Sequence, residues 1–467
     1  MPARVNYHAP LSGVPVRVSG TGADAWHAAR MLRWLGAVVG SEAENSGSAA
    51  DWAASGAMAL TGRRDGPPLL PPGQAASAVN GALLAIECLA RMAGGAPALP
   101  RAGILSERAA IAGLERDAPR SAGGAFRILR AADGWLGVNL ARESDRELLP
   151  AWLEDHEPVL EKAVAAKTAG ELAGRARLLG LPAAALPTGP DEQLAARGQL
   201  SAVLPFVLTR YQAPRETGAG AHAGGHLAQR RRGRFTVVDL SSLWAGPLCG
   251  HLLTALGARV IKVESAHRPD GTRSGPRGFY DLLHAGQESV ALDFTTTAGR
   301  SALAGLVAAA DAVIEASRPR ALRQLGIHAE DLLARGQDKC WISITAYGRT
   351  GPWANAAGFG DDTAMAAGLV AFDPATGTPA PCGDAIADPV TGVNAALVAL
   401  ACRLAGGSWL ADLAMREQVA ATMVGTAVSG YADPAGAAVL PAPRAPAGRA
   451  PELGADTAAV LAELLPR

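Results

Sequence analysis

The apolar positions of this chain follow one pattern at two places. Residues 14–39 and 236–263 each read as a short β-branched strand, a turn containing glycine, an amphipathic helix ending at Leu-Gly-Ala, and a second valine-rich strand. Gly36 and Gly257 stand directly after the leucine, where a helix commonly ends in a left-handed residue. The pattern predicts two βαβ units, whose parallel strands would be covered by helices.

Further segments resemble one another in the two halves of the chain. An Ala-rich helix is predicted at residues 80–95 and again at 391–407, and the preceding segments 54–68 and 366–381 are also alike. We therefore expect an internally duplicated α/β protein, with a Rossmann-like parallel sheet and a smaller α+β domain. The predicted division is a first copy over 1–212, a flexible linker over 213–234, a main domain over 235–440, and a C-terminal Pro/Ala-rich segment with a helix over 441–467.

Composition narrows the class of protein. The formal net charge of the 467 residues is zero, which argues against a nucleic-acid or membrane-surface partner. The five cysteines form no Cys-x-x-Cys pair and the nine histidines no His-x-x-x-His spacing, so we expect a reduced compartment and no metal site. The first residues contain no apolar leader, and no apolar run approaches the length of a membrane span. A cytoplasmic location is therefore expected.

Several turns carry residues that suit ligand binding. The turn at Gly20 matches Gly-x-Gly-x-x-Ala, the dinucleotide-binding pattern, although Gly/Ala-rich sequences produce this short motif by chance. Pro247 suits the first turn of a helix, whose free amides could receive an anion. Arg318, Arg320 and Arg323 form a cationic group whose planar forks suit phosphate, or which is simply solvated.

Five ordered segments within residues 235–425 resemble the family III CoA-transferases. These segments are VVDLSSLWAGPLCGHLLTALGARVIKVE, ESVALDF, IEASRPRALRQLG, ISITAYGRTGP and GFGDD. The resemblance implies an enzyme that moves CoA between an acyl-CoA thioester and a small carboxylate acceptor through an aspartyl intermediate. It implies no cofactor, because coenzyme A is a substrate. Chains of this family interlock in pairs, which implies a homodimer or a pseudo-dimer within one chain.

The resemblance also implies roles for particular residues. The acidic pair of GFGDD corresponds to the family's catalytic aspartate: an ungapped match falls on Gly360, and a one-residue deletion brings it to Asp361. We expect Asp361 to be the nucleophile and Asp362 to cap the helix that follows, since adjacent side chains point to different sides. The residues implied for CoA binding are Trp244, Ala245, Gly246, Pro247, Glu264, Arg268, Arg273 and Arg318.

Two alternatives remain open at this point. Departures from the family at CoA-contact positions, namely Gln287-Glu288, Ala316-Ser317 and Gln324, favour a non-catalytic CoA-binding paralogue or scaffold. A 2-methylacyl-CoA racemase would need a histidine as partner base ahead of the aspartate, and residues 327–360 offer only His328. The sequence names neither the acyl donor nor the acceptor.

Overall fold

Both predicted βαβ units are present in the computed structural model, which describes residues 9–46, 49–187, 204–213, 235–336, 338–424, 430–431 and 438–465. The first unit consists of β1 (Pro15–Arg17), α1 (Ala23–Trp34) and β2 (Val38–Gly40), and the second of β8 (Thr236–Asp239), α11 (Ala245–Ala255) and β9 (Arg259–Ser265). The strands of each unit are parallel. Gly36 and Gly257 have φ values of 91° and 88°, the left-handed stops that the sequence predicts.

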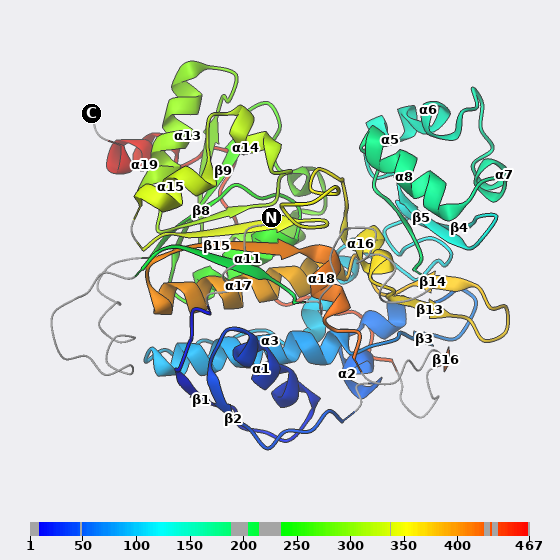
Figure 1. The fold of residues 1–467 in the computed structure, drawn as a ribbon, viewed down its shortest axis with the longest axis horizontal. Helices are drawn as coiled ribbons and strands as arrows, with labels where there is room; N and C mark the ends of the chain where they lie inside the picture. The colour runs from blue at the N-terminus through cyan, green and yellow to red at the C-terminus, as the bar shows by residue number, and fades with distance from the viewer. Residues whose placement is uncertain are drawn as a thin grey trace, which may run out of the picture.

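A seven-stranded sheet forms the centre of the molecule (Figure 1). Its strand order is β10-β9-β8-β11-β12-β15-β7, and all neighbours are parallel except β7, which is antiparallel to β15. The further strands are β10 (Glu288–Leu292), β11 (Ala312–Glu315), β12 (Cys340–Thr345), β15 (Ser408–Ala414) and β7 (Val207–Gln212). Strand β7 precedes the predicted linker, of which only Ala213 is among the described residues. The first half of the chain therefore completes the sheet of the second half.

The sheet has helices on both faces. Val237 and Ile342 join the core formed with α11 and α17 (Ala387–Ala405), whereas Val238 and Val313 join a second core on the other face. This second core includes residues of α13 (Thr297–Ala309), α15 (Ala329–Arg335) and α19 (Thr457–Leu464). Alternation of side chains along each strand produces the two cores, as expected for a sheet buried on both sides. We call this unit the sheet domain.

The first βαβ unit continues the layers beyond α17. Helix α3 (Ala75–Met92) packs between α17 and α1, and the β1–β2 pair lies outermost (Figure 1). Gly81 of α3 permits a close crossing, because a Cβ there would lie 2.7 Å from the Asp24 carbonyl oxygen. By length and hydropathy α3 could cross a membrane, contrary to the expectation that no apolar run is long enough. However, 67% of this helix is buried within the protein.

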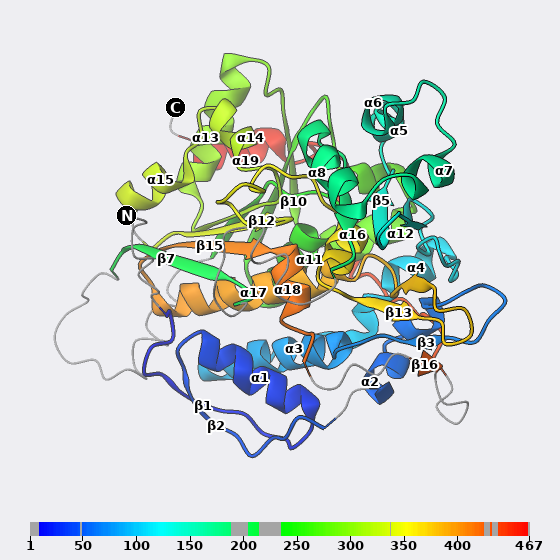
Figure 2. The same ribbon diagram turned by 45° about the vertical axis from the view of Figure 1, so that its right-hand side comes forward.

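A small domain of residues 126–185 lies beside the sheet domain (Figure 2). Its antiparallel sheet contains β4 (Phe126–Arg130), β5 (Trp135–Asn139) and β6 (Ala183–Ala185). Four helices cover this sheet: α5 (Glu143–Glu147), α6 (Leu149–Leu153), α7 (Leu160–Ala165) and α8 (Ala169–Leu179). The small domain has its own apolar core around Trp152, which donates a hydrogen bond to the Leu172 carbonyl oxygen.

Shorter elements connect these parts. They are α2 (Ala49–Ala54), β3 (Leu69–Leu70), α4 (Glu107–Ala112), α12 (Arg277–His284), α14 (Arg320–Gln324), α16 (Gly360–Ala366), β13 (Val370–Phe372), β14 (Pro379–Pro381), α18 (Met415–Ala420) and β16 (Gly430–Tyr431). Three of them bear on the candidate site: α4 comes from the first half of the chain, and α14 and α16 come from the second.

Candidate active site

The order of the strands creates a crevice at one edge of the sheet. From β8 the chain proceeds to β9 and β10 on one side, and it then returns to β11 and β12 on the other. The carboxyl ends of β8 and β11 therefore flank a topological switch point, where open α/β sheets bind ligands. Trp244 to Pro247 follow β8, and Arg318 follows β11. The fold thus brings together two of the segments that the sequence predicts to bind CoA.

The first turn of α11 is closely packed. The Trp244 ring is 3% exposed and stands edge-on to Phe279, with ring centroids 5.5 Å apart. Ala245, Gly246 and Pro247 form the first helical turn, as predicted. Only glycine fits at position 246, because a Cβ there would lie 2.0 Å from the Ser241 hydroxyl oxygen.

The other residues predicted for CoA binding lie in two different settings. Glu264 and Arg273 form an ion pair in which Nε of Arg273 is 2.9 Å from Oε1 of Glu264. Their side chains are 3% and 12% exposed, so this pair lies within the interior of the sheet domain. Arg268 is exposed, and its positive charge lies near Arg318. Contact of these three residues with CoA stays a prediction.

The two aspartates of GFGDD lie in different environments, one buried and one partly exposed. Asp362 is completely buried, and its Oδ1 accepts a hydrogen bond of 2.8 Å from the Phe359 N–H at the start of α16. Asp362 therefore caps α16 from the third helical position (N3), whereas Phe359 is the N-cap residue. Burial raises the pKa of Asp362 well above its ordinary value. Asp361 is partly exposed, and its Oδ1 accepts a hydrogen bond of 2.9 Å from the Ala385 N–H.

Two further carboxylates and one guanidinium surround Asp361. Arg108 of α4 donates two hydrogen bonds to the buried Asp384, one of them 2.9 Å from Nε to Oδ2. Asp388, in the first turn of α17, accepts a hydrogen bond from the Ala245 N–H. We call Asp361, Asp384, Asp388 and Arg108 the carboxylate cluster. It joins residues from both halves of the chain, and the Arg108 guanidinium lies 5.5 Å from the Trp244 ring centre.

Burial and neighbouring charges raise the pKa values of two carboxylates of the cluster. Burial, together with the negative charge of Asp384, raises the pKa of Asp361 to about 6, against the opposing effect of Arg108. Burial also raises the pKa of Asp388 to about 7, again opposed by Arg108 and reinforced by Asp361. A carboxylate whose pKa lies near neutrality can act as a nucleophile or as a base.

The Asp388 carboxylate packs directly against Gly360. A Cβ at residue 360 would lie 2.2 Å from Oδ2 of Asp388 and 2.5 Å from the Ala385 carbonyl oxygen. The Asp388 carboxylate therefore fills the place where a side chain at residue 360 would begin. This is also the position at which the ungapped family match puts its catalytic aspartate.

Sequence reasoning missed four residues of this site: Arg108, Ser121, Asp384 and Asp388. The Ser121 hydroxyl hydrogen-bonds to Asp361. The one available signal was the Asp-Pro pair at 388–389, which suits a helix start. The helix was expected to begin at residue 391, but α17 begins at Ala387 and includes this pair.

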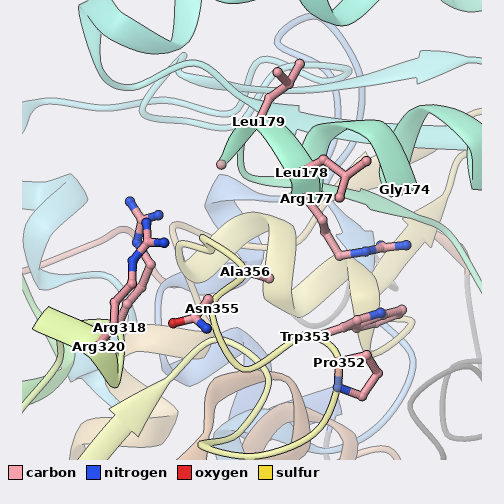
Figure 3. A pocket seen from close by; sticks show the side chains of 11 residues that line it. Gly174, Arg177, Leu178, Leu179, Arg318, Arg320, Pro352, Trp353, Asn355 and Ala356 are labelled. Carbon is pink, nitrogen blue, oxygen red and sulfur yellow. The ribbon is translucent and has the colours of Figure 1, made fainter. Parts of the chain in front are cut away.

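Arg318 lies at the side of a cavity of about 470 Å³ between the small domain and the sheet domain. Arg320 and Arg177 line the same cavity (Figure 3). Arg323, the third arginine of the predicted cationic group, instead pairs with Glu330 at 3.0 Å. The predicted group is therefore divided, and only two of its members face the cavity.

Comparison with known proteins finds similarity to one family over the second half of the chain. Residues 234–456 match the model of CoA-transferase family III. Succinyl-CoA–D-citramalate CoA-transferase of Chloroflexus aurantiacus is 32% identical over 40% of this chain and 50% of that protein. Succinate–glutarate CoA-transferase of Agrobacterium fabrum is 33% identical over 34% of this chain and 43% of that protein. The chain thus spans half or less of the length of these curated relatives.

Among solved structures, a CAIB/BAIF family protein from Brucella suis is similar to this chain. It is 30% identical over 41% of this chain and 54% of that chain, with a TM-score of 0.38. The family match and the curated relatives agree with the five segments noted in the sequence. Residues 234–456 of this chain are therefore similar to CoA-transferase family III.

Proposed function

We propose that this protein transfers CoA from an acyl-CoA thioester to a carboxylate acceptor, with Asp388 as the nucleophile. The observation that carries this proposal is the position of a partly exposed carboxylate against the first turn of α11, beside the switch-point crevice. The curated relatives support the reaction class, because their names describe CoA transfer among succinate, citramalate and glutarate.

The four candidate carboxylates differ in their freedom to react. Asp362 is buried and holds the Phe359 N–H, and Asp384 is buried and bound twice by Arg108. Asp361 and Asp388 remain, since both are partly exposed. Asp388 is favoured over Asp361, the candidate that the sequence suggested, because it occupies the space above Gly360 and lies at the amino end of α11.

The proposed reaction proceeds through two kinds of covalent intermediate, an anhydride and a thioester. A carboxylate oxygen attacks the thioester carbon and expels the CoA thiolate, which gives an acyl-aspartyl anhydride. The thiolate then attacks the aspartyl carbonyl carbon, which releases the donor acid and leaves an aspartyl-CoA thioester. The acceptor carboxylate reverses these steps, forming the new acyl-CoA and restoring the aspartate. Backbone N–H groups near the first turn of α11 are suited to stabilise the oxyanions.

In this proposal the first half of the chain contributes to the reacting site as a second subunit would. In the second half, a Cβ at Gly392 of α17 would lie 2.6 Å from the Ala245 carbonyl oxygen at the start of α11. In the first half, Gly81 of α3 lies equally close to the Asp24 carbonyl oxygen at the start of α1. This equivalence supports an internal duplication, and Ser77 then corresponds to Asp388. Because serine replaces the carboxylate there, we propose one reacting site per chain, completed by Arg108 from the first half.

Trapping the covalent intermediate tests the function. Wild-type protein and the variants Asp388→Asn and Asp361→Asn are incubated with succinyl-CoA and then analysed by tandem mass spectrometry. No Lys or Arg separates Arg349 from Arg403, so one tryptic peptide contains both aspartates, and fragment ions must locate the adduct. We expect CoA on Asp388 in the wild type and none in Asp388→Asn.

Other outcomes of this experiment have definite meanings. An adduct on Asp361 would move the nucleophile to the residue that the sequence first suggested. If a panel of acyl-CoA thioesters gave no adduct and no exchange of label into a free acid, the proposed transfer would be wrong, and a non-catalytic CoA-binding role would replace it.

A further inference from the structure

A second arginine, Arg444, is linked to the carboxylate cluster through the short helix α4. It belongs to residues 438–456, which precede α19 and which we call the C-terminal segment. The start of this segment lies against the first half of the chain, where the Val439 N–H donates a hydrogen bond of 3.2 Å to the Ala53 carbonyl oxygen. The C-terminal segment thereby brings Arg444 to the beginning of α4, which also comes from the first half.

The Arg444 guanidinium joins two helices. Both carboxylate oxygens of Glu107, the first residue of α4, accept hydrogen bonds from it, and the distance from Nη2 to Oε2 is 3.0 Å. Its Nη1 lies 2.9 Å from Nε2 of His251 on α11. Because arginine offers only donors, His251 accepts this bond, and burial together with the charge of Arg444 lowers the pKa of His251 to about 4. Near neutral pH the guanidinium therefore links α4 to a neutral ring on α11.

Two adjacent residues of α4 pair with opposite charges. Glu107 is 2% exposed and pairs with Arg444. Arg108 pairs with Asp384 in the carboxylate cluster. Neighbouring side chains on a helix point in different directions, so each residue can face its own partner. Because α4 has only six residues, its stability and orientation depend on such tertiary contacts.

We propose that Arg444 is a positioning residue, which holds the Glu107 carboxylate apart from Arg108 and so directs the Arg108 guanidinium to the carboxylate cluster. Arg444 acts on the cluster only through Arg108. The importance of this orientation for catalysis rests on the proposed function, whereas the orientation itself does not.

Loss of Arg444 would leave Glu107 buried and unpaired beside Arg108. A buried carboxylate without a partner is unfavourable, and the guanidinium of the next residue is a cation that can replace the lost one. Arg108 would then move away from the three carboxylates that it faces in the cluster. The pKa values of Asp361 and Asp388 would rise, because Arg108 opposes the effect of burial at both. A charge about 5 Å from a carboxylate that moves away by about 1 Å changes the pKa by about 0.4 unit.

Carboxyl titration of the ligand-free protein tests the inference. Protein with isotopically labelled aspartate carboxyl carbons is titrated by NMR from about pH 4 to about pH 9, and the Asp388 resonance is the one missing from Asp388→Asn. We expect Arg444→Met to raise the pKa of Asp388 by about 0.4 unit or more. Methionine retains an apolar stem and removes the charge.

The matched control is Arg449→Met, which removes an arginine from the same C-terminal segment. Arg449 is 75% exposed and pairs at the surface with Glu452. The titration of Asp388 in this variant should match that of the wild type.

Two further variants identify the cause of the shift. In Glu107→Gln/Arg444→Met no carboxylate remains on α4 to attract Arg108, so Asp388 should titrate as in the wild type. Arg444→Gln retains an N–H donor for Glu107 and protects folding, and it should shift the titration in the same direction as Arg444→Met. The inference is overturned if the double variant shifts as far as Arg444→Met, or if neither single variant that thermal unfolding shows to be folded shifts at all.

The same variants separate this inference from the proposed function. If Arg444→Met shifts the titration but no acyl-CoA reacts with the wild type, the positioning role stands and the transferase proposal fails. If CoA is transferred, kcat/KM of Arg444→Met should level off at a higher pH than that of the wild type. Transfer with neither the titration nor this pH profile changed would overturn the role of Arg444 and leave the proposed function intact.

Discussion

Replacing Gly360 by alanine tests whether the Asp388 carboxylate occupies the space above residue 360. The added Cβ would lie 2.2 Å from Oδ2 of Asp388, about 1.2 Å closer than the onset of ordinary van der Waals contact at 3.4 Å. It would also lie 2.5 Å from the Ala385 carbonyl oxygen, which belongs to the backbone and cannot rotate away. The carboxylate must therefore move by about 1 Å.

We expect Gly360→Ala to lower activity more than it lowers the free energy of unfolding. Overpacking of this kind costs about 1–3 kcal/mol. Alanine regains up to about 1 kcal/mol of helix propensity, so the free energy of unfolding should fall by roughly 1–2 kcal/mol. Activity should fall much further, because a reacting group misplaced by about 1 Å can cost about 100-fold in rate.

The assay compares kcat for acyl transfer with thermal unfolding of the same preparations. Gly170→Ala is the matched control, because Gly170 lies in the first turn of α8 with nothing within 4 Å of its missing Cβ. It should keep full activity and unchanged or slightly higher stability. If Gly360→Ala were as active and as stable as Gly170→Ala, the carboxylate would not lie where the structure has it, and the assignment of Asp388 would lose its main support.

Four further predictions follow from the charged groups. The value of kcat/KM should rise with pH up to about 7 and then level off, because burial raises the pKa of Asp388 and the nucleophile must be ionised. Protonation of Asp361 and Asp388 stabilises the fold, so the free energy of unfolding should fall as pH rises from about 4 to about 7, and less so in Asp388→Asn. Arg108→Gln should shift the rate profile to higher pH, since the guanidinium lowers both pKa values; an unshifted profile would contradict its place in the cluster. Arg273→Ala should cost about 3–5 kcal/mol of stability by leaving Glu264 buried and unpaired, and denaturant unfolding that matched the wild type would contradict this.

The sequence by itself determined the local elements and the family that residues 234–456 resemble. Both βαβ units, their glycine stops and the proline in the first turn of α11 were predicted from periodicity and residue type, which depend on neighbours along the chain. The five ordered segments indicated the same family that residues 234–456 match, because each is a short motif that can be read without knowledge of the fold. The acidic pair of GFGDD was correctly placed at a helix start beside the candidate site.

Tertiary structure alone decided which side chains meet. Arg108 and Asp384 are 276 residues apart in sequence, and no local pattern connects a short helix of the first half with a loop of the second. Whether Asp361 or Asp388 lies nearer the crevice depends on the packing of α16 against α17, and the close fit of Gly360 is visible only there. In the same way, Arg320 and Arg323 share one helix, and the neighbours supplied by the fold determine that one faces a cavity and the other an acid. Periodicity reports contacts along a segment, whereas a site is made by contacts between segments, whose arrangement follows from burying many apolar faces at once.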